Sequence, residues 1–203
     1  MKIVDINLIF QLIKNRKEGN TMKLGLYVGS FNPVHNGHIK VINYLLDNDL
    51  VDKVIVLPTP NYWDKQNLLD LKHRVEMLKI IERENVIIDE ENSKYPYTYQ
   101  VINNIKKENK KDEIYLVIGS DNLEKLHLWK NINLILENKI IVLKRGNTDI
   151  NKYLDRFDKE RFIIVDDFDY IDVCSTNIRN GIYENVDERV VEYIKKNNLY
   201  ERK

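Results

Sequence analysis

The sequence has almost no cysteine, no net charge and no long hydrophobic run. Its single cysteine, Cys174, excludes an internal disulfide framework and favours a reducing compartment, so we expect a cytoplasmic protein. Lys plus Arg and Asp plus Glu both number 32, which argues against a general nucleic-acid binder because such a protein carries a basic face. No apolar run approaches the ~20 residues that a helix needs to cross a bilayer, so we expect no membrane segment.

The length and composition predict one globular domain. The chain has 203 residues, of which 43% are hydrophobic and 32% charged, which is enough to build a buried core. The pattern typical of a folded domain starts after Met22, and we expect a single domain over 22–203. Residues 1–21 match a signal peptide poorly, because the basic pair Arg16-Lys17 follows the apolar stretch instead of preceding it. We therefore interpret 1–21 as an extension, with Met22 as the true start.

Apolar runs alternate with segments of helical spacing along the chain. Six runs are almost continuously hydrophobic, as in parallel strands buried on both faces: Leu24–Val28, Val54–Leu57, Val86–Ile88, Ile114–Ile118, Ile140–Leu143 and Phe162–Val165. Apolar residues three and four apart predict helices over His38–Leu46, Leu71–Ile81, Tyr99–Ile105 and Val190–Leu199. This alternation predicts an α/β fold with a doubly wound, Rossmann-like parallel sheet, whose ligands bind beyond the carboxyl ends of the strands.

The segment Gly29–His38 lies where the first strand would give way to the first helix. Such a turn offers free backbone N–H groups and a positive helix end to a phosphate, and imidazoles can donate hydrogen bonds to charge developing on phosphorus. The segment lacks the Lys-Ser/Thr ending of a P-loop and the three-glycine dinucleotide fingerprint. A metal site is the rival interpretation of His35 and His38, but no third ligand lies nearby in the sequence, so we expect none.

A second candidate anion site lies near the C-terminus, in Cys174–Arg179. Ser175 or Thr176 can cap a helix there, and Arg179 falls one turn in, where its guanidinium suits a phosphate. Taken alone, the segment fits an ordinary capped helix with a solvated arginine better than an anion site. Together with the histidine turn, it favours a nucleotide site.

The two motifs, in this order, resemble the signatures of the nucleotidyltransferase superfamily that includes the bacterial nicotinate-nucleotide adenylyltransferases, and the resemblance covers nearly the whole chain from Lys23 on. It implies a nucleotidyltransferase-type fold and an enzyme of NAD biosynthesis that joins nicotinate mononucleotide to the AMP part of ATP, giving deamido-NAD and pyrophosphate. It also implies that His35, His38 and Arg179 are catalytic. The ATP-binding residues that it implies are Gly29, Ser30, Phe31, His35, Gly37, His38, Gly119, Asp121, Ser175, Thr176 and Arg179.

Further segments resemble the nicotinate-nucleotide branch. Pro96-Tyr97-Thr98 is similar to its tyrosine-threonine element, and Gly119-Ser120-Asp121 with Leu126 and Trp129 is similar to its Gly-x-Asp…Leu…Trp segment. The resemblance implies a substrate-binding set of Lys65, Arg74, Tyr97, Thr98, Trp129 and Arg145. An indole can stack on a pyridine ring, and both Trp63 and Trp129 are candidates for that contact.

Other functions stay open from the sequence. Asn32 stands where the family usually has Asp, which keeps the turn chemistry but loses a charge. The acceptor could be nicotinamide mononucleotide, phosphopantetheine or a phospho-alcohol, and a non-catalytic nucleotide-binding module is the alternative outside enzymes. We expect Mg²⁺ to arrive with ATP, and expect ATP and nicotinate mononucleotide as the only partners, with no nucleic acid and no membrane. The oligomeric state and the preference for acid or amide pyridines cannot be read from the sequence.

Overall fold

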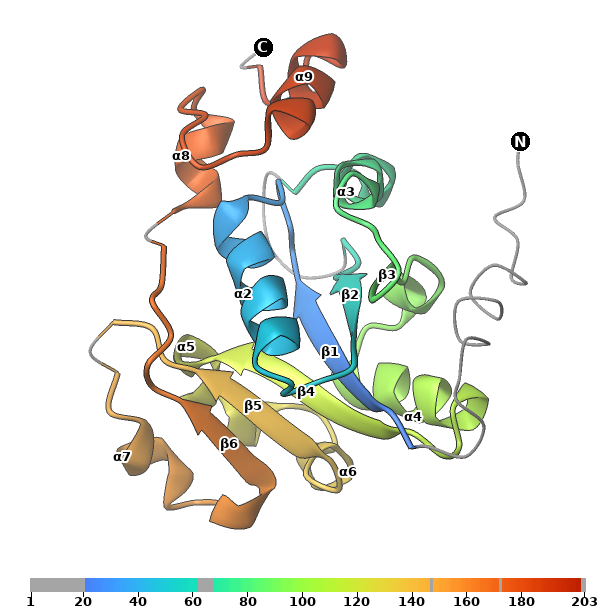
Figure 1. Ribbon diagram of the computed structural model, residues 1–203, viewed down its shortest axis with the longest axis vertical. Helices are drawn as coiled ribbons and strands as arrows, with labels where there is room; N and C mark the ends of the chain where they lie inside the picture. The colour runs from blue at the N-terminus through green and yellow to red at the C-terminus, as the bar shows by residue number, and fades with distance from the viewer. Residues whose placement is uncertain (1–20, 62–67, 147, 172, 202–203) are drawn as a thin grey trace.

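The computed structural model describes residues 21–61, 68–146, 148–171 and 173–201 (Figure 1). Six strands in this part of the chain form one sheet in the order β3-β2-β1-β4-β5-β6, and every neighbouring pair is parallel. This is the Rossmann order of a doubly wound sheet, and it confirms the fold expected from the sequence. The strands are β1 (Lys23–Gly29), β2 (Lys53–Pro58), β3 (Val86–Ile88), β4 (Glu113–Gly119), β5 (Lys139–Leu143) and β6 (Phe162–Val165).

The four longer helices form where apolar spacing predicted them, with ends that differ by a few residues. They are α2 (Asn36–Asp47), α3 (Leu71–Lys79), α4 (Thr98–Glu108) and α9 (Glu188–Lys196). Shorter elements complete the connections, and most of them are too short to carry a periodic signal. They are η1 (Glu91–Lys94), α5 (Ser120–Leu123), η2 (Leu126–Leu128), α6 (Ile132–Ile135), α7 (Ile150–Leu154), η3 (Lys159–Arg161) and α8 (Ser175–Arg179).

Alternate residues of each strand enter two separate cores, one on each face of the sheet. In β4, Val117 packs in the core that contains α2, α3, α8 and α9, whereas Leu116 packs in the core that contains α4, α5, α6 and α7. Figure 1 shows α2 lying across β1 on the first of these faces. Because both faces are covered, the strands are hydrophobic almost throughout, and burying one such leucine stabilises the fold by roughly 2 kcal/mol.

The sheet reverses its direction of winding between β1 and β4. The chain leaves β1 through α2 toward β2 on one side, and leaves β4 through α5 and α6 toward β5 on the other. A crevice therefore opens beyond the carboxyl ends of these two strands, at Gly29 and Gly119, which is where ligands bind in open α/β sheets.

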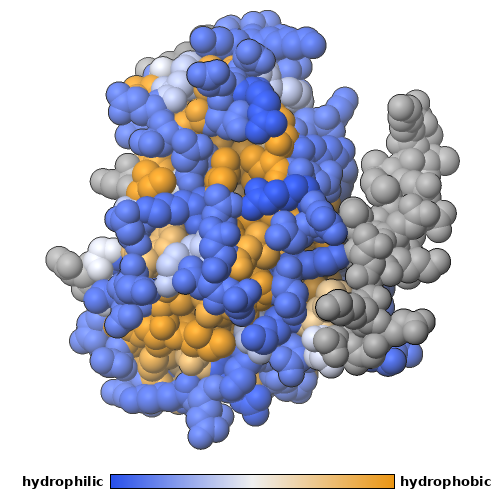
Figure 2. Space-filling view, viewed as in Figure 1, coloured by the Kyte–Doolittle hydropathy of each residue, from blue (hydrophilic) through white to orange (hydrophobic). Residues whose placement is uncertain are grey.

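The surface in view in Figure 2 is mostly hydrophilic, with apolar atoms visible between the polar side chains. Among the helices in the described ranges, none is long and apolar enough to cross a membrane. The expectation that Met22 is the true start concerns residues 1–21, of which 1–20 lie outside the described residues.

Candidate functional site

A large cavity of about 1170 Å³ lies at the switch point between β1 and β4. Its size suits a nucleotide with an acceptor beside it, since small-ligand sites measure roughly 300–1,000 Å³. Segments that are distant in the sequence meet around it, at the ends of β1, β2 and β4 and at the starts of α4 and α8. Of the residues expected at the site, the cavity is lined by Gly29, Ser30, Phe31, His38, Tyr97, Thr98, Gly119, Asp121, Trp129, Arg145, Ser175 and Arg179.

The histidine turn links β1 to α2 through a compact bend. Phe31 adopts a left-handed backbone with φ of 44°, and its side chain is almost fully buried. Its ring meets His38 edge-on, with centroids 4.9 Å apart. Gly37 at the start of α2 has little space, because a Cβ there would lie 2.7 Å from a methyl of Val173. The start of α2 therefore lies close against Val173, in the segment before α8.

The two histidines form one stacked pair, in which His35 is buried and His38 is half-buried. Their rings stack with centroids 3.7 Å apart, and the backbone N–H of His35 donates to Nδ1 of His38 at 3.2 Å. Because Nδ1 accepts, the proton of a neutral His38 ring sits on Nε2, which is then free to donate to a ligand. Burial, with the charge of Arg145, lowers the pKa of His35 to about 4. Burial likewise holds the pKa of His38 well below its usual range, so both rings are neutral at pH 7.

The helix α8 contacts the histidine turn directly. The hydroxyl of Ser175 donates to the carbonyl of Pro33 at 3.3 Å. Arg179 donates from Nη1 to the carbonyl of Asn32 at 2.9 Å and from Nη2 to the hydroxyl of Thr176 at 2.8 Å. The two motifs singled out in the sequence thus meet at one wall of the cavity.

The side chain of Asn32 ties this turn to two other segments. Its Oδ1 accepts from the backbone N–H of Leu69 at 3.3 Å and from the hydroxyl of Tyr200 at 2.9 Å. Both bonds need only an acceptor oxygen, which Asn and Asp supply equally. The departure from Asp at this position is therefore compatible with the same turn, and the C-terminal Tyr200 helps to hold it.

Arg145 follows β5 and reaches across the end of β4. Its backbone N–H donates to the hydroxyl of Ser120 at 2.9 Å, which fixes the start of its loop. Its guanidinium lies 3.6 Å from the carboxylate of Asp121 and 5.1 Å from the ring centroid of Tyr170. The cavity is therefore lined by two arginines, Arg145 and Arg179.

Aromatic side chains also line the cavity. Tyr97 and Thr98 line it from the start of α4, and Trp129 lines it from the end of η2. Trp129 is half-buried against the second core, so part of its indole stays accessible from the cavity. Trp63 and Lys65 lie outside the described residues, so the choice between the two tryptophans stays a prediction.

Arg74, which the resemblance places in the substrate-binding set, is not among the residues that line the cavity. It is fully buried, and its guanidinium donates to the carbonyls of Ser30, Thr59 and Leu69 at 2.8, 2.7 and 3.0 Å. A fourth bond goes to Oδ1 of Asn61 at 2.7 Å. All of its donor nitrogens are thus used inside the protein, and the side chain joins the loop after β1 to the loop after β2.

Some residues that were expected at the site do not line the cavity. Other residues line it that the sequence analysis did not assign to ligand binding. His35, Gly37 and Thr176 touch lining residues but do not line the cavity themselves. The additional lining side chains come mainly from strand ends and loops, among them Tyr27, Asn32, Thr59, Pro60, Leu128 and Lys130. Position after a strand is the one signal that could have identified Thr59, which directly follows β2.

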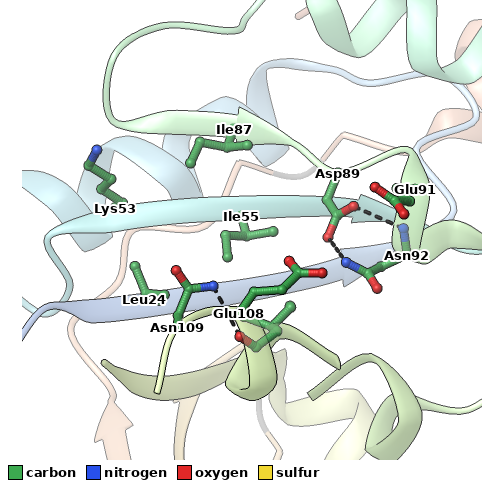
Figure 3. Close-up of a pocket in the computed structure, with 10 residues that line it drawn as sticks. Leu24, Lys53, Ile55, Ile87, Asp89, Glu91, Asn92, Glu108 and Asn109 are labelled. Atoms are coloured by element: carbon green, nitrogen blue, oxygen red, sulfur yellow. Dashed lines mark hydrogen bonds between the residues drawn. The ribbon is translucent and has the colours of Figure 1, made fainter. Parts of the chain in front are cut away.

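A second cavity, of about 60 Å³, lies between α4 and the strands β1, β2 and β3 (Figure 3). It has room for a few water molecules and none for a nucleotide. Its Asp89 is fully engaged, accepting from the backbone and the side-chain amide of Asn92 at 2.9 and 2.6 Å. Within the described ranges, no group of three or more His, Cys, Asp or Glu residues is placed to hold a metal ion.

The sequence of this chain is similar to those of known proteins. Residues 26–181 match the model of the cytidylyltransferase-like family. A probable nicotinate-nucleotide adenylyltransferase of Clostridium tetani is 32% identical over 199 residues, covering 88% of this chain and 98% of that protein. A protein of the same description from Borrelia garinii subsp. bavariensis is 33% identical over 198 residues, covering 90% and 96%.

Solved structures share the fold. The nicotinic acid mononucleotide adenylyltransferase of Plasmodium falciparum complexed with NaAD aligns with a TM-score of 0.74 at 22% identity, covering 88% of this chain and 97% of that one. A putative nicotinate-nucleotide adenylyltransferase from Vibrio parahaemolyticus aligns with a TM-score of 0.62, covering 90% and 98%.

Proposed function

The chain belongs to the cytidylyltransferase-like family and, within it, to the nicotinate-nucleotide adenylyltransferases, and we propose that it transfers the adenylyl group of ATP to nicotinate mononucleotide. A 5′-phosphate oxygen of nicotinate mononucleotide attacks the α-phosphorus of ATP. The bond from that phosphorus to the bridging β-phosphate oxygen breaks, and its electron pair leaves with pyrophosphate. Deamido-NAD is the other product, and the reaction is a step of NAD biosynthesis.

The observation that carries this proposal is the contact between the two phosphate-binding motifs. Arg179 of α8 donates to the carbonyl of Asn32, so the arginine and the histidine turn face the same cavity. A triphosphate is long enough to meet both motifs at once. The acceptor phosphate is already an anionic nucleophile, so the protein works by alignment and by stabilising charge, as in phosphoryl transfer generally.

His38 is the residue that we assign to the transition state. Its Nδ1 is occupied by the backbone of His35, which leaves Nε2–H to donate to the α-phosphate oxygens. The ring is neutral, and because its Nδ1 accepts a hydrogen bond, its single proton sits on Nε2. His35 supports His38 by stacking and by its backbone N–H, and so acts behind the reacting atoms.

Ser175 and Arg179 hold the leaving pyrophosphate in this scheme. Arg179 is half-buried and its position is set by Asn32 and Thr176, so its remaining donors can serve the β- and γ-phosphates. Thr176 acts by orienting Arg179. At the other end, Tyr97, Thr98 and Trp129 form the aromatic surface for the pyridine nucleotide.

Mg²⁺ enters as part of the ATP complex, because a small hard cation prefers phosphate oxygens and its own waters. It supplies neutralisation of the triphosphate charge, and the chain contributes the histidine, serine and arginine contacts described above. The use of ATP and the single cysteine fit a reaction in the cytoplasm.

The test is pyrophosphate release by the purified protein with ATP and Mg²⁺. Acceptors are offered one at a time: nicotinate mononucleotide, nicotinamide mononucleotide, phosphopantetheine and a phospho-alcohol with CTP in place of ATP. We expect release with nicotinate mononucleotide at a kcat/KM at least about tenfold above the others, together with deamido-NAD by mass spectrometry. Release with another acceptor alone would replace the substrate, and ATP binding without any release would make the protein a nucleotide sensor.

A further inference from the structure

We propose that Tyr200 is a positioning residue: its hydroxyl donates to the side chain of Asn32 and so fixes the backbone carbonyl that Arg179 contacts. This inference rests on the proposed function, because it assigns to these contacts the placement of the arginine that holds the leaving pyrophosphate. Among the described residues, Asn32 and Arg179 line the cavity and Tyr200 does not, so Tyr200 acts through Asn32.

The end of α9 directs the chain toward the histidine turn. Asn198 has a left-handed backbone with φ of 49°, and its N–H donates to the carbonyl of Lys195 at 3.2 Å. The N–H of Leu199 donates to the carbonyl of Ile194 at 3.0 Å. These two bonds form a Schellman cap, in which asparagine is one of the few residues that suit the left-handed position. Leu199 and Tyr200 then pack against the core that contains α2 and α3.

Tyr200 is held in an uncommon backbone conformation. Its φ of 66° lies in the left-handed region, which a bulky residue seldom adopts and which persists only where surrounding contacts fix it. The side chain is half-buried, and its hydroxyl donates to Oδ1 of Asn32 at 2.9 Å. Burial raises the pKa of Tyr200 above its ordinary value, although the charges of Arg179 and Arg74 act against that rise. The phenol therefore keeps its proton for this bond at neutral pH.

Asn32 connects this hydroxyl to the arginine. Its Oδ1 can only accept, and it also receives the backbone N–H of Leu69 at 3.3 Å. The backbone carbonyl of the same residue accepts from Nη1 of Arg179 at 2.9 Å. Asn32 is 5% exposed, so its side chain and its carbonyl have little room to move independently. Loss of the Tyr200 hydroxyl should therefore loosen the carbonyl that orients Arg179.

The test is a double-mutant cycle with Tyr200→Phe, Arg179→Met and the double variant. The matched control is Tyr193→Phe, which removes a hydroxyl from α9 itself. That hydroxyl bonds His73 at 3.0 Å, and neither residue lines the cavity. The measurements are kcat, the KM values for ATP and for nicotinate mononucleotide, the Kd of α,β-methylene ATP by calorimetry, and thermal unfolding of every variant.

We expect Tyr200→Phe to lower kcat/KM for ATP about fivefold, the factor that corresponds to one neutral hydrogen bond, and to leave the KM for nicotinate mononucleotide unchanged. In the Arg179→Met background the same substitution should change kcat/KM by less than about twofold, because the two residues act as a unit. Tyr193→Phe should keep the wild-type kcat/KM even where its melting temperature falls as far as that of Tyr200→Phe.

Wild-type kinetics of Tyr200→Phe, an equal loss in both backgrounds, or an equal loss in Tyr193→Phe would overturn the proposal. If the wild type released no pyrophosphate with any acceptor, the proposed function would fail, and the Kd values would decide the role of Tyr200. A Kd weakened about fivefold by Tyr200→Phe in the wild-type background alone would support that role, and any other pattern of Kd values would overturn it.

Discussion

Replacing Arg74 by Met tests whether this arginine is a structural clamp or a substrate contact. The guanidinium is fully buried and satisfies three backbone carbonyls from two loops, those of Ser30, Thr59 and Leu69. Methionine fills much of the volume but donates nothing, and an orphaned buried carbonyl costs about 1–3 kcal/mol. We take the lower value, about 1 kcal/mol, for each of the three carbonyls, because removing a buried charge offsets part of the loss. The free energy of unfolding should therefore fall by about 3 kcal/mol.

Urea unfolding followed by tryptophan fluorescence measures this loss, which should also lower Tm by roughly 10 °C in a domain of this size. Lys72→Met is the matched control, because it removes a positive charge from an exposed site on the same helix, α3, and should change stability by less than about 0.5 kcal/mol. Arg74→Lys keeps the positive charge but loses the planar guanidinium, so its free energy of unfolding should lie between those of Arg74→Met and Lys72→Met.

The reasoning would be refuted if Arg74→Met were as stable as the wild type. It would also be refuted if the variant kept its stability but showed a KM for nicotinate mononucleotide raised about a hundredfold. That second result would return Arg74 to the substrate-binding set expected from the sequence.

Two further predictions concern the histidine turn. Because the pKa of His35 is about 4 in the folded protein and near 6.5 when unfolded, the unfolded state takes up a proton first as pH falls. The contribution of His35 to stability should therefore fall by about 1.4 kcal/mol per pH unit between about pH 6.5 and pH 4. His35→Gln should remove that part of the slope in urea midpoints measured at pH 7 and pH 5, and equal slopes would contradict the prediction. Gly37→Ala should cost about 1–3 kcal/mol, since its Cβ would lie 2.7 Å from Val173, and an unchanged Tm would count against that packing.

Most of the fold, and some of the residues that line the cavity, could be predicted from the sequence. The strands and the four longer helices were predictable because continuous apolar runs and apolar spacing of three and four residues are local signals. The short helices α5, α6 and α7 were not predictable, because four or five residues are too few to show a helical period. The meeting of the histidine turn with α8 followed from the resemblance and is seen in the contact of Arg179 with Asn32.

Two arginines show why the rest of the site could not be predicted from the sequence. Arg74 and Arg145 look alike in the sequence, as basic residues near loops that follow strands. In the structure Arg74 donates to carbonyls of two loops, whereas Arg145 lines the cavity from the loop after β5. Which loops converge on a side chain is a long-range property, so no local pattern separates the two.

The kcat of His38→Ala with ATP and nicotinate mononucleotide tests the central claim most directly. Loss of one donor to the transition state should lower kcat by about 10²–10³-fold while the melting temperature stays close to that of the wild type. His73→Ala is the control, because His73 bonds Tyr193 at 3.0 Å and does not line the cavity, and it should retain kcat. A His38→Ala enzyme within about threefold of the wild-type kcat would contradict the assignment of this imidazole to the α-phosphate.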